Sequence, residues 1–349
     1  MEYRKIGNTE IELSIFGLGC WSFGGGEYWG MEHDQKIIDQ VVSHAVDLGV
    51  NYFDTAEVYN EGRSESSLGL ALKNVQREKV IVGTKIAPSN CYSGQITKHC
   101  EASLSKLNTD YIDIYMLHWP IHAHSIRHFT HDQNLIDNPP SQDETIEELL
   151  KLQSAGKIRH IGVSNHSTRR LTSFSADTSI VINQLPYNLL SRAVEYEVLP
   201  YCKSRGIGVI GYSSLMQGIL ADVYPDIMSI PDMLKRTRHF DNNGNTKSRH
   251  GEHGFEKEVT ESLNAIRKIA KENEISMADL SLKWAVANDA ISSSLVGVRN
   301  VKRLEANIKA INESIDSNII NALSQVTDTL KEKLGHYLDY YEGAINDRT

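Results

Sequence analysis

Short apolar runs alternate with stretches of helical periodicity along almost the whole chain. The runs are rich in β-branched residues, which is typical of buried strands. Eight such runs lie at residues 15–19, 50–53, 80–84, 111–116, 158–163, 180–183, 207–211 and 291–296. Helical patterns lie at 34–48, 64–73, 95–107, 143–155, 167–174, 195–205, 257–273 and 300–311. Alternation of this kind favours parallel strands joined by crossover helices, so we expect an α/β fold, a single (β/α)8 TIM barrel.

Further elements are expected outside these eight units. Two short segments, 3–6 and 11–13, flank a Gly-Asn turn signal and predict a small antiparallel β-hairpin before the barrel. Helical patterns at 277–287 and 316–331 predict additional helices that cover the barrel without starting a new domain.

Two long segments between the predicted elements, 120–142 and 218–256, follow the fourth and seventh strands. In a barrel they emerge on the C-terminal face, where active sites lie, and we expect them to shape a substrate pocket. The chain is expected to form one domain, 1–349, with its core over about 3–311 and a C-terminal helix and tail over 312–349.

Charge and cysteine content narrow the class of partner. The 45 acidic and 36 basic residues give a net charge of −9, which argues against general attraction to nucleic acid or anionic membranes. The four cysteines, at 20, 91, 100 and 202, have no paired metal spacing and are expected to be free thiols. With no apolar run near the ~18 residues of a membrane span, we expect a soluble cytoplasmic protein with a small-molecule partner.

Four chemically distinctive residues follow the ends of neighbouring predicted strands: Asp54, Tyr59, Lys85 and His118. A barrel would bring them to one rim. There, the lysine would lower the pKa of the tyrosine, the carboxylate would orient the lysine, and the histidine would polarise a carbonyl oxygen. Each residue alone also has a structural interpretation, as a cap, a packing residue or a solvated charge. Their combination favours machinery for carbonyl reduction.

The segments FDTAEVY, GRSESSLGLAL, KLNTDYIDIYMLHWP and GKIRHIGVSN resemble the aldo-keto reductase family, and the resemblance covers about residues 3–311. It implies that Tyr59 is the proton donor, that Asp54 and Lys85 tune it, and that His118 orients the carbonyl. It also implies a nicotinamide cofactor bound on a barrel, with no Gly-rich dinucleotide fingerprint.

The cofactor contacts implied by this resemblance follow the order of the chain. Ser164, Asn165 and Gln184 would contact the nicotinamide carboxamide, and Tyr212 would stack on its ring. The segment GYSSLMQGIL would cross the pyrophosphate, with candidate contacts at Ser213, Leu215, Gln217 and Gly218. An ordinary strand-to-loop turn is the structural alternative for that segment.

The segment GVRNVKRLEAN resembles the family's adenosine-phosphate segment, with candidate contacts at Gly297, Arg299, Arg303 and Asn307. The two arginines would approach a 2′-phosphate, helped by a helix N-terminus, and Asn307 would reach the adenine. The sequence departs from the family pattern at Ser214, Val296, Arg303 and Ala306. Because Arg303 adds positive charge, NADPH is expected, with NADH as the alternative.

Four aromatic residues on predicted rim loops form the expected substrate pocket: Trp21, Tyr28, Trp29 and Trp119. The alternative is that they only pack the loops together. Histidines gather after the fourth strand, at positions 118, 122, 124, 128 and 131. A polar loop is favoured over a metal site there, because no HExxH motif or cysteine pair accompanies them.

The sequence therefore predicts an NAD(P)H-dependent reductase of aldehydes or ketones that binds a small carbonyl or alcohol and no nucleic acid, membrane or metal. One alternative is a regulatory subunit that binds the cofactor with little turnover. Another is a metal-dependent barrel hydrolase. Oligomeric state and substrate are left open.

Overall fold

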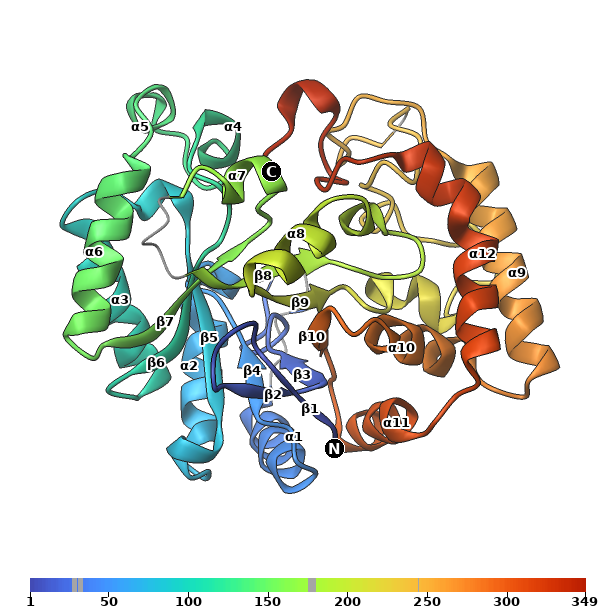
Figure 1. Cartoon of the computed structure of the whole chain (residues 1–349), viewed down its shortest axis with the longest axis horizontal. Helices are drawn as coiled ribbons and strands as arrows, with labels where there is room; N and C mark the ends of the chain where they lie inside the picture. The colour runs from blue at the N-terminus through green and yellow to red at the C-terminus, as the bar shows by residue number, and fades with distance from the viewer. Residues whose placement is uncertain (27–29, 31–33, 175–179, 244) are drawn as a thin grey trace.

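The computed structural model describes residues 1–26, 30, 34–174, 180–243 and 245–349. Eight parallel strands close into a barrel in the order β10-β3-β4-β5-β6-β7-β8-β9. The strands are β3 (Phe16–Gly19), β4 (Tyr52–Asp54), β5 (Ile81–Ile86), β6 (Ile112–Leu117), β7 (Ile158–Ser164), β8 (Ile180–Pro186), β9 (Gly208–Tyr212) and β10 (Ile291–Val296). The TIM barrel expected from the sequence is confirmed (Figure 1).

Strand β6 shows why these runs are continuously apolar. All six of its residues are buried, because one face fills the barrel and the other is covered by helices. Ile114 and Met116 belong to an inner cluster, whereas Tyr115 and Leu117 belong to the larger core outside the barrel wall. Alternate side chains therefore stabilise two separate layers.

The N-terminal hairpin, β1 (Tyr3–Lys5) and β2 (Glu12–Ser14), pairs antiparallel as expected. It closes one end of the barrel, because Ile6 and Leu13 are fully buried in the same inner cluster as the barrel-filling side chains. The turn of the hairpin needs glycine: Gly7 has a φ of 50° and lies so close to the Gly206 carbonyl that a Cβ would overlap it.

Helices surround the barrel and mostly match the predicted ranges. They are α1 (Gln35–Asp47), α2 (Arg63–Leu72), α3 (Gln95–Leu107), α6 (Gln142–Ser154), α7 (Thr168–Leu171), α8 (Val198–Arg205), α10 (Met277–Ala287) and α11 (Val301–Asn312). The helix expected over 167–174 is short, since α7 ends at Leu171, and residues 175–179 lie outside the described part of the chain.

Residues 277–287 form a helix that covers the barrel, as predicted. This segment is α10, which packs directly against β10 and α11. Its apolar residues occupy more than one face, so Leu280, Leu282 and Trp284 are all buried. The preceding helix α9 (Glu256–Glu272) has one apolar stripe and packs against α12 (Ser317–Leu334), at the outer edge of the molecule in Figure 1.

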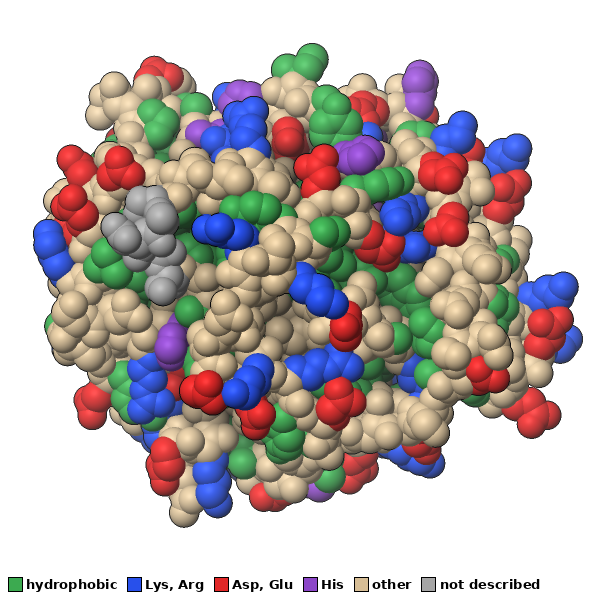
Figure 2. Space-filling view, viewed as in Figure 1, with side chains coloured by type: hydrophobic (Ala, Val, Ile, Leu, Met, Phe, Trp, Pro, Cys, Tyr) green, Lys and Arg blue, Asp and Glu red, His purple; other side chains and the backbone are tan. Residues whose placement is uncertain are grey.

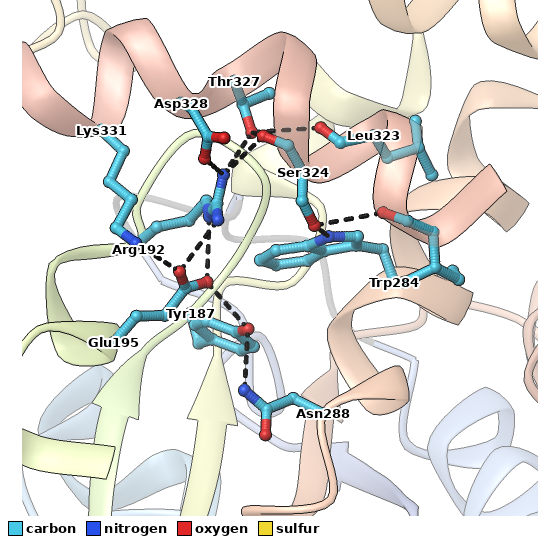
Figure 3. Close-up of polar contacts among 11 residues, drawn as sticks. Tyr187, Arg192, Glu195, Trp284, Asn288, Leu323, Ser324, Thr327, Asp328 and Lys331 are labelled. Atoms are coloured by element: carbon cyan, nitrogen blue, oxygen red, sulfur yellow. Dashed lines mark hydrogen bonds and ion pairs between the residues drawn. The ribbon is translucent and has the colours of Figure 1, made fainter. Parts of the chain in front are cut away.

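A polar network fastens α12 to the loop that follows β8 (Figure 3). The buried Arg192 donates to the Ser324 carbonyl at 2.7 Å and to the Asp328 carboxylate at 2.8 Å. Glu195 accepts from both Arg192 and Lys331. Because every charge in this group has an opposite partner, the network can be buried without leaving an isolated ion.

The two long segments and the tail meet over the C-terminal side of the barrel. Segment 120–142 contains two short helices, α4 (Ala123–Ile126) and α5 (Gln133–Asp137). The Arg238 backbone N–H, in segment 218–256, donates to the Tyr340 carbonyl at 2.7 Å. Glu342 in the tail pairs with Arg249 at 2.6 Å and with His128 at 3.3 Å. The tail therefore joins the two long segments.

The surface carries charges of both signs. On the face displayed in Figure 2, acidic and basic side chains are interspersed. Among the described residues, none of the helices is long and apolar enough to span a membrane.

Candidate active site

The structure brings Asp54, Tyr59, Lys85 and His118 together at the C-terminal end of the barrel. The fully buried Lys85 ammonium donates to the two Asp54 carboxylate oxygens at 2.9 and 2.8 Å. The same Nζ atom lies 3.5 Å from the Tyr59 hydroxyl. The Tyr59 and His118 rings are 5.6 Å apart between centroids, edge to face. All four residues therefore belong to one site.

The strand ends explain this convergence. Asp54 is the last residue of β4, Lys85 lies one residue before the end of β5, and His118 follows β6 directly. Adjacent parallel strands end at the same rim. Tyr59 is in the loop after β4, which Asn60 anchors by donating to the carbonyls of Trp21 and Phe23 at 2.7 and 2.9 Å.

The acidity of Tyr59 differs from the sequence-based expectation. Burial raises the pKa of the Tyr59 hydroxyl well above its usual value, and the negative charge of the Asp54 carboxylate raises this pKa further. The expected lowering of this pKa by Lys85 is therefore wrong as a net effect. The physical reason is that Asp54 neutralises the Lys85 ammonium at direct contact, while burial penalises a charged tyrosinate.

Burial also shifts the pKa values of Lys85 and His118. Burial lowers the pKa of Lys85, and the neighbouring Asp54 carboxylate opposes that shift. Burial, with the positive charges of Lys85 and Arg348, lowers the pKa of His118 well below its usual value. His118 is consequently neutral near pH 7. Its buried Nδ1 has no hydrogen-bond partner among the described residues.

A hydrogen-bonded chain extends this site across the ends of β7, β8 and β9. Gln184 Nε2 donates to Asp54 Oδ1 at 2.7 Å, and Ser164 Oγ donates to the Gln184 carbonyl at 3.0 Å. Asn165 donates to the His118 carbonyl at 3.0 Å and accepts from the Tyr212 hydroxyl at 2.8 Å. The residues expected around a nicotinamide therefore lie beside the four central residues.

The segment after β9 has an unusual backbone. Ser213, Gln217 and Gly218 have φ values of 59°, 55° and 99°, all in the left-handed region. Ser214 fastens the segment by contacts to the Ser294 hydroxyl at 2.6 Å and the Leu295 carbonyl at 3.0 Å. These bonds fix Ser214, one of the positions at which the sequence departs from the family pattern.

A small hollow borders this segment. Ser213 and Gln217 line it, and so do Arg236, Tyr340 and Tyr341, which the sequence analysis did not identify. Leu215 is half-buried and packs against the core. The basic run KRTR in a long loop was a signal for Arg236. Tyr340 and Tyr341 had none, because contacts between a loop and a distant tail leave no periodic pattern.

The expected adenosine-phosphate residues lie at the junction of β10 and α11. Gly297, Arg299 and Arg303 are exposed, whereas Asn307 is buried on the inner face of α11. The helix begins at an Asn300 cap, whose side chain accepts from the Arg303 backbone N–H at 2.8 Å. This group therefore lies where β10 ends, at the C-terminal rim of the barrel.

Two of the four predicted pocket aromatics can be placed, and Tyr28 and Trp29 lie outside the described residues. The Trp21 ring lies 5.9 Å from the Tyr59 ring between centroids. The Trp119 ring is buried beneath the Arg348 guanidinium, 3.9 Å from it. Phe129, which the sequence analysis did not identify, lies 5.7 Å from the His118 ring.

The histidine-rich segment contacts the tail. His122 Nε2 donates to the Arg348 carbonyl at 3.0 Å, and His128 pairs with Glu342. Within the described ranges there is no group of three or more His, Cys, Asp or Glu residues that could hold a metal ion. The four cysteines are free and buried.

A closed parallel barrel with a buried Asp–Lys pair beside a half-buried tyrosine and a neutral histidine at its C-terminal rim is the architecture of a barrel oxidoreductase. The model of the aldo/keto reductase family matches residues 16–328, and the chain belongs to this family. It is an NAD(P)H-dependent oxidoreductase that reduces an aldehyde or ketone to an alcohol.

Individual relatives agree with this assignment. The chain is 33% identical to the aldo-keto reductase YhdN of Bacillus subtilis, over 88% of this chain and 87% of that protein. It is 30% identical to the NADH-specific methylglyoxal reductase of Escherichia coli, over 95% and 100% of the two chains. The solved holo structure of aldo-keto reductase AKR11C1 from Bacillus halodurans has the same fold, with a TM-score of 0.71, 22% identity and coverage of 93% and 96%.

Proposed function

We propose that Tyr59 is the general acid of the reaction and that His118 orients the substrate. The observation that carries this is the contact of one buried ammonium, Lys85, with both Asp54 and the Tyr59 hydroxyl. Because the pKa of Tyr59 is raised, its hydroxyl is protonated at neutral pH and available to protonate an alkoxide. The neutral His118 donates a hydrogen bond to the carbonyl oxygen and so fixes its position.

The residues present fit a nicotinamide cofactor. Ser164, Asn165 and Gln184 offer polar groups beside Asp54, and the half-buried Tyr212 ring lies next to them. Ser213 and Gln217, which have left-handed backbone, line a hollow together with Arg236. The positive charge of Arg236 would favour the pyrophosphate of the cofactor there. When bound, the cofactor supplies the hydride, and the residues of the chain hold the carbonyl carbon in reach of it and transfer the proton.

NADPH is the proposed preferred cofactor. The support is the pair of exposed arginines, Arg299 and Arg303, at the N-terminus of α11, where helix amides add favourable partial charge. The Escherichia coli relative is named as NADH-specific, so cofactor preference varies among relatives of this chain. Direct comparison of the two cofactors decides the point.

The proposed substrate is a small aldehyde or ketone that binds near Trp21 and Phe129, whose rings lie beside Tyr59 and His118. A panel that includes methylglyoxal and a nitrobenzaldehyde, run with NADPH and with NADH, tests reaction class and cofactor together. Oxidation of the cofactor that depends on the carbonyl is expected. Cofactor binding without turnover on any substrate would favour the regulatory alternative, and loss of activity on chelation would favour a metal-dependent enzyme.

A cytoplasmic location, a single domain and the absence of a nucleic-acid partner stay predictions from the sequence. Fractionation of the producing cells and limited proteolysis of the purified chain test the first two, and a binding assay with mixed RNA and DNA tests the third.

A further inference from the structure

Glu57 lies between Asp54 and Tyr59 in the chain, and its side chain is almost completely buried away from both. Its Oε1 atom accepts from the Ala87 backbone N–H at 2.7 Å and from Asn90 Nδ2 at 2.8 Å. Its Oε2 atom accepts from His99 Nδ1 at 2.6 Å. Three donors from the segment after β5 and from α3 therefore converge on one carboxylate.

The backbone of Glu57 makes a second connection to the same strand. Its N–H donates to the Lys85 carbonyl at 3.2 Å, two residues before Ala87. Main chain and side chain of Glu57 thus hold the end of β5, at the Lys85 carbonyl and at Ala87 just beyond the strand. Asn60 holds the other end of the loop, toward the carbonyls of Trp21 and Phe23. Tyr59 lies between these two anchors.

The spacing of the catalytic groups makes this anchor important. The 3.5 Å from Lys85 Nζ to the Tyr59 hydroxyl is at the outer limit of a hydrogen bond. A displacement of the loop by about 1 Å would separate them, and misplacement of that size can cost about a hundredfold in rate. The shortest contact of the Lys85 ammonium with this loop is to the Thr55 carbonyl, at 2.7 Å, four residues before Tyr59.

We propose that Glu57 is a positioning residue that holds the Tyr59 hydroxyl in register with Lys85, through its contacts with Ala87, Asn90 and His99. The inference rests on the proposed role of Tyr59. Glu57 touches no reacting atom, so its removal slows proton donation without removing any group that binds the substrate or the cofactor.

The test compares Glu57→Ala, Glu57→Gln and the control Glu61→Ala, which removes an exposed carboxylate from the same loop. The rate of a single turnover is measured with whichever of NADPH and NADH the wild type uses, together with KM and the cofactor Kd. For Glu57→Ala we expect a single-turnover rate at least about tenfold lower, with KM and Kd within about twofold of wild type. Glu57→Gln, whose remaining side-chain oxygen still accepts from the Ala87 N–H, is expected to recover most of the rate.

A wild-type rate for folded Glu57→Ala, or an equal loss for Glu61→Ala, would overturn the proposal. If Glu57→Ala does not fold, His99→Leu takes its place, because it leaves one Glu57 oxygen without its donor. A rate reduced about threefold or more is expected for it, and an unchanged rate overturns the inference. Tyr59→Phe in the same series tests the proton-donor role of Tyr59 separately from the positioning role of Glu57. If Tyr59→Phe turns over normally, the proposed role of Tyr59 itself is wrong.

Discussion

The Lys85 ammonium contacts both carboxylate oxygens of Asp54, and neither residue has more than 4% of its side chain exposed. Such a pair is costly to break, because removal of one partner leaves the other as a buried, uncompensated charge. The pair therefore fixes both the electrostatics of the site and part of the stability of the barrel.

Replacing Lys85 by Met is expected to lower the free energy of unfolding by about 3 to 5 kcal/mol and to abolish most turnover. The unpaired Asp54 carboxylate would also raise the pKa of Tyr59 further. Urea denaturation and steady-state rates check this. The double variant Lys85→Met with Asp54→Asn serves as the control and should recover stability without activity. Equal destabilisation of single and double variants would contradict the explanation.

Replacing Tyr59 by Phe is expected to lower the rate of reduction by roughly 10² to 10⁴, because the proton donor is lost while the ring still packs against Trp21 and His118. The affinity for the cofactor should change little. Cofactor fluorescence titration and initial rates measure the two quantities, and a variant that retains normal turnover would refute the assignment.

The pH dependence follows from the directions of the pKa shifts. The pKa of Tyr59 is raised, so its hydroxyl keeps its proton through neutral and mildly alkaline pH. The pKa of His118 is lowered, so its ring stays neutral down to acidic pH. For reduction, kcat/KM is therefore expected to be flat between about pH 6 and 9, whereas alcohol oxidation, which needs a basic Tyr59, should rise with pH. A bell-shaped profile for reduction centred in that range would be inconsistent with these shifts.

Replacing Arg299 and Arg303 together by Ala should weaken NADPH binding on the order of tenfold or more, and NADH binding far less. NADH is the internal control, since it has a hydroxyl in place of the 2′-phosphate and any damage to the fold would weaken both cofactors. Binding titrations measure the difference. Equal weakening of the two would remove the argument for a phosphate site and leave Asn307 as the expected adenosine contact.

Replacing Arg348 by Ala should loosen the tail over the candidate substrate pocket. Arg348 makes 2.6 and 2.8 Å bonds to the buried Asp339 and covers the Trp119 ring. We expect a loss of about 3 kcal/mol in the free energy of unfolding, reduced when Asp339→Asn is added, and a higher KM for the carbonyl substrate. Denaturation and steady-state kinetics check both, with the exposed Arg127→Ala as the matched control.

The sequence by itself determined the barrel and the position of its central residues. Strands such as 111–116 are recognisable because both of their faces are buried, so apolar character is continuous along the run. In a barrel of eight parallel strands, all strands end at the same rim. Asp54, Lys85 and His118 therefore lie at one rim, whatever their separation in sequence.

Only the tertiary structure decided how distant parts meet. Gln184 contacts Asp54 across 130 positions of the chain, and Arg348 lies on Trp119. The partners of α9 and α10, and the upward shift of the Tyr59 pKa, likewise depend on which surfaces are buried against each other. Local periodicity shows that a face will be buried, but packing and desolvation depend on the groups that cover it, and those come from segments far away in the sequence.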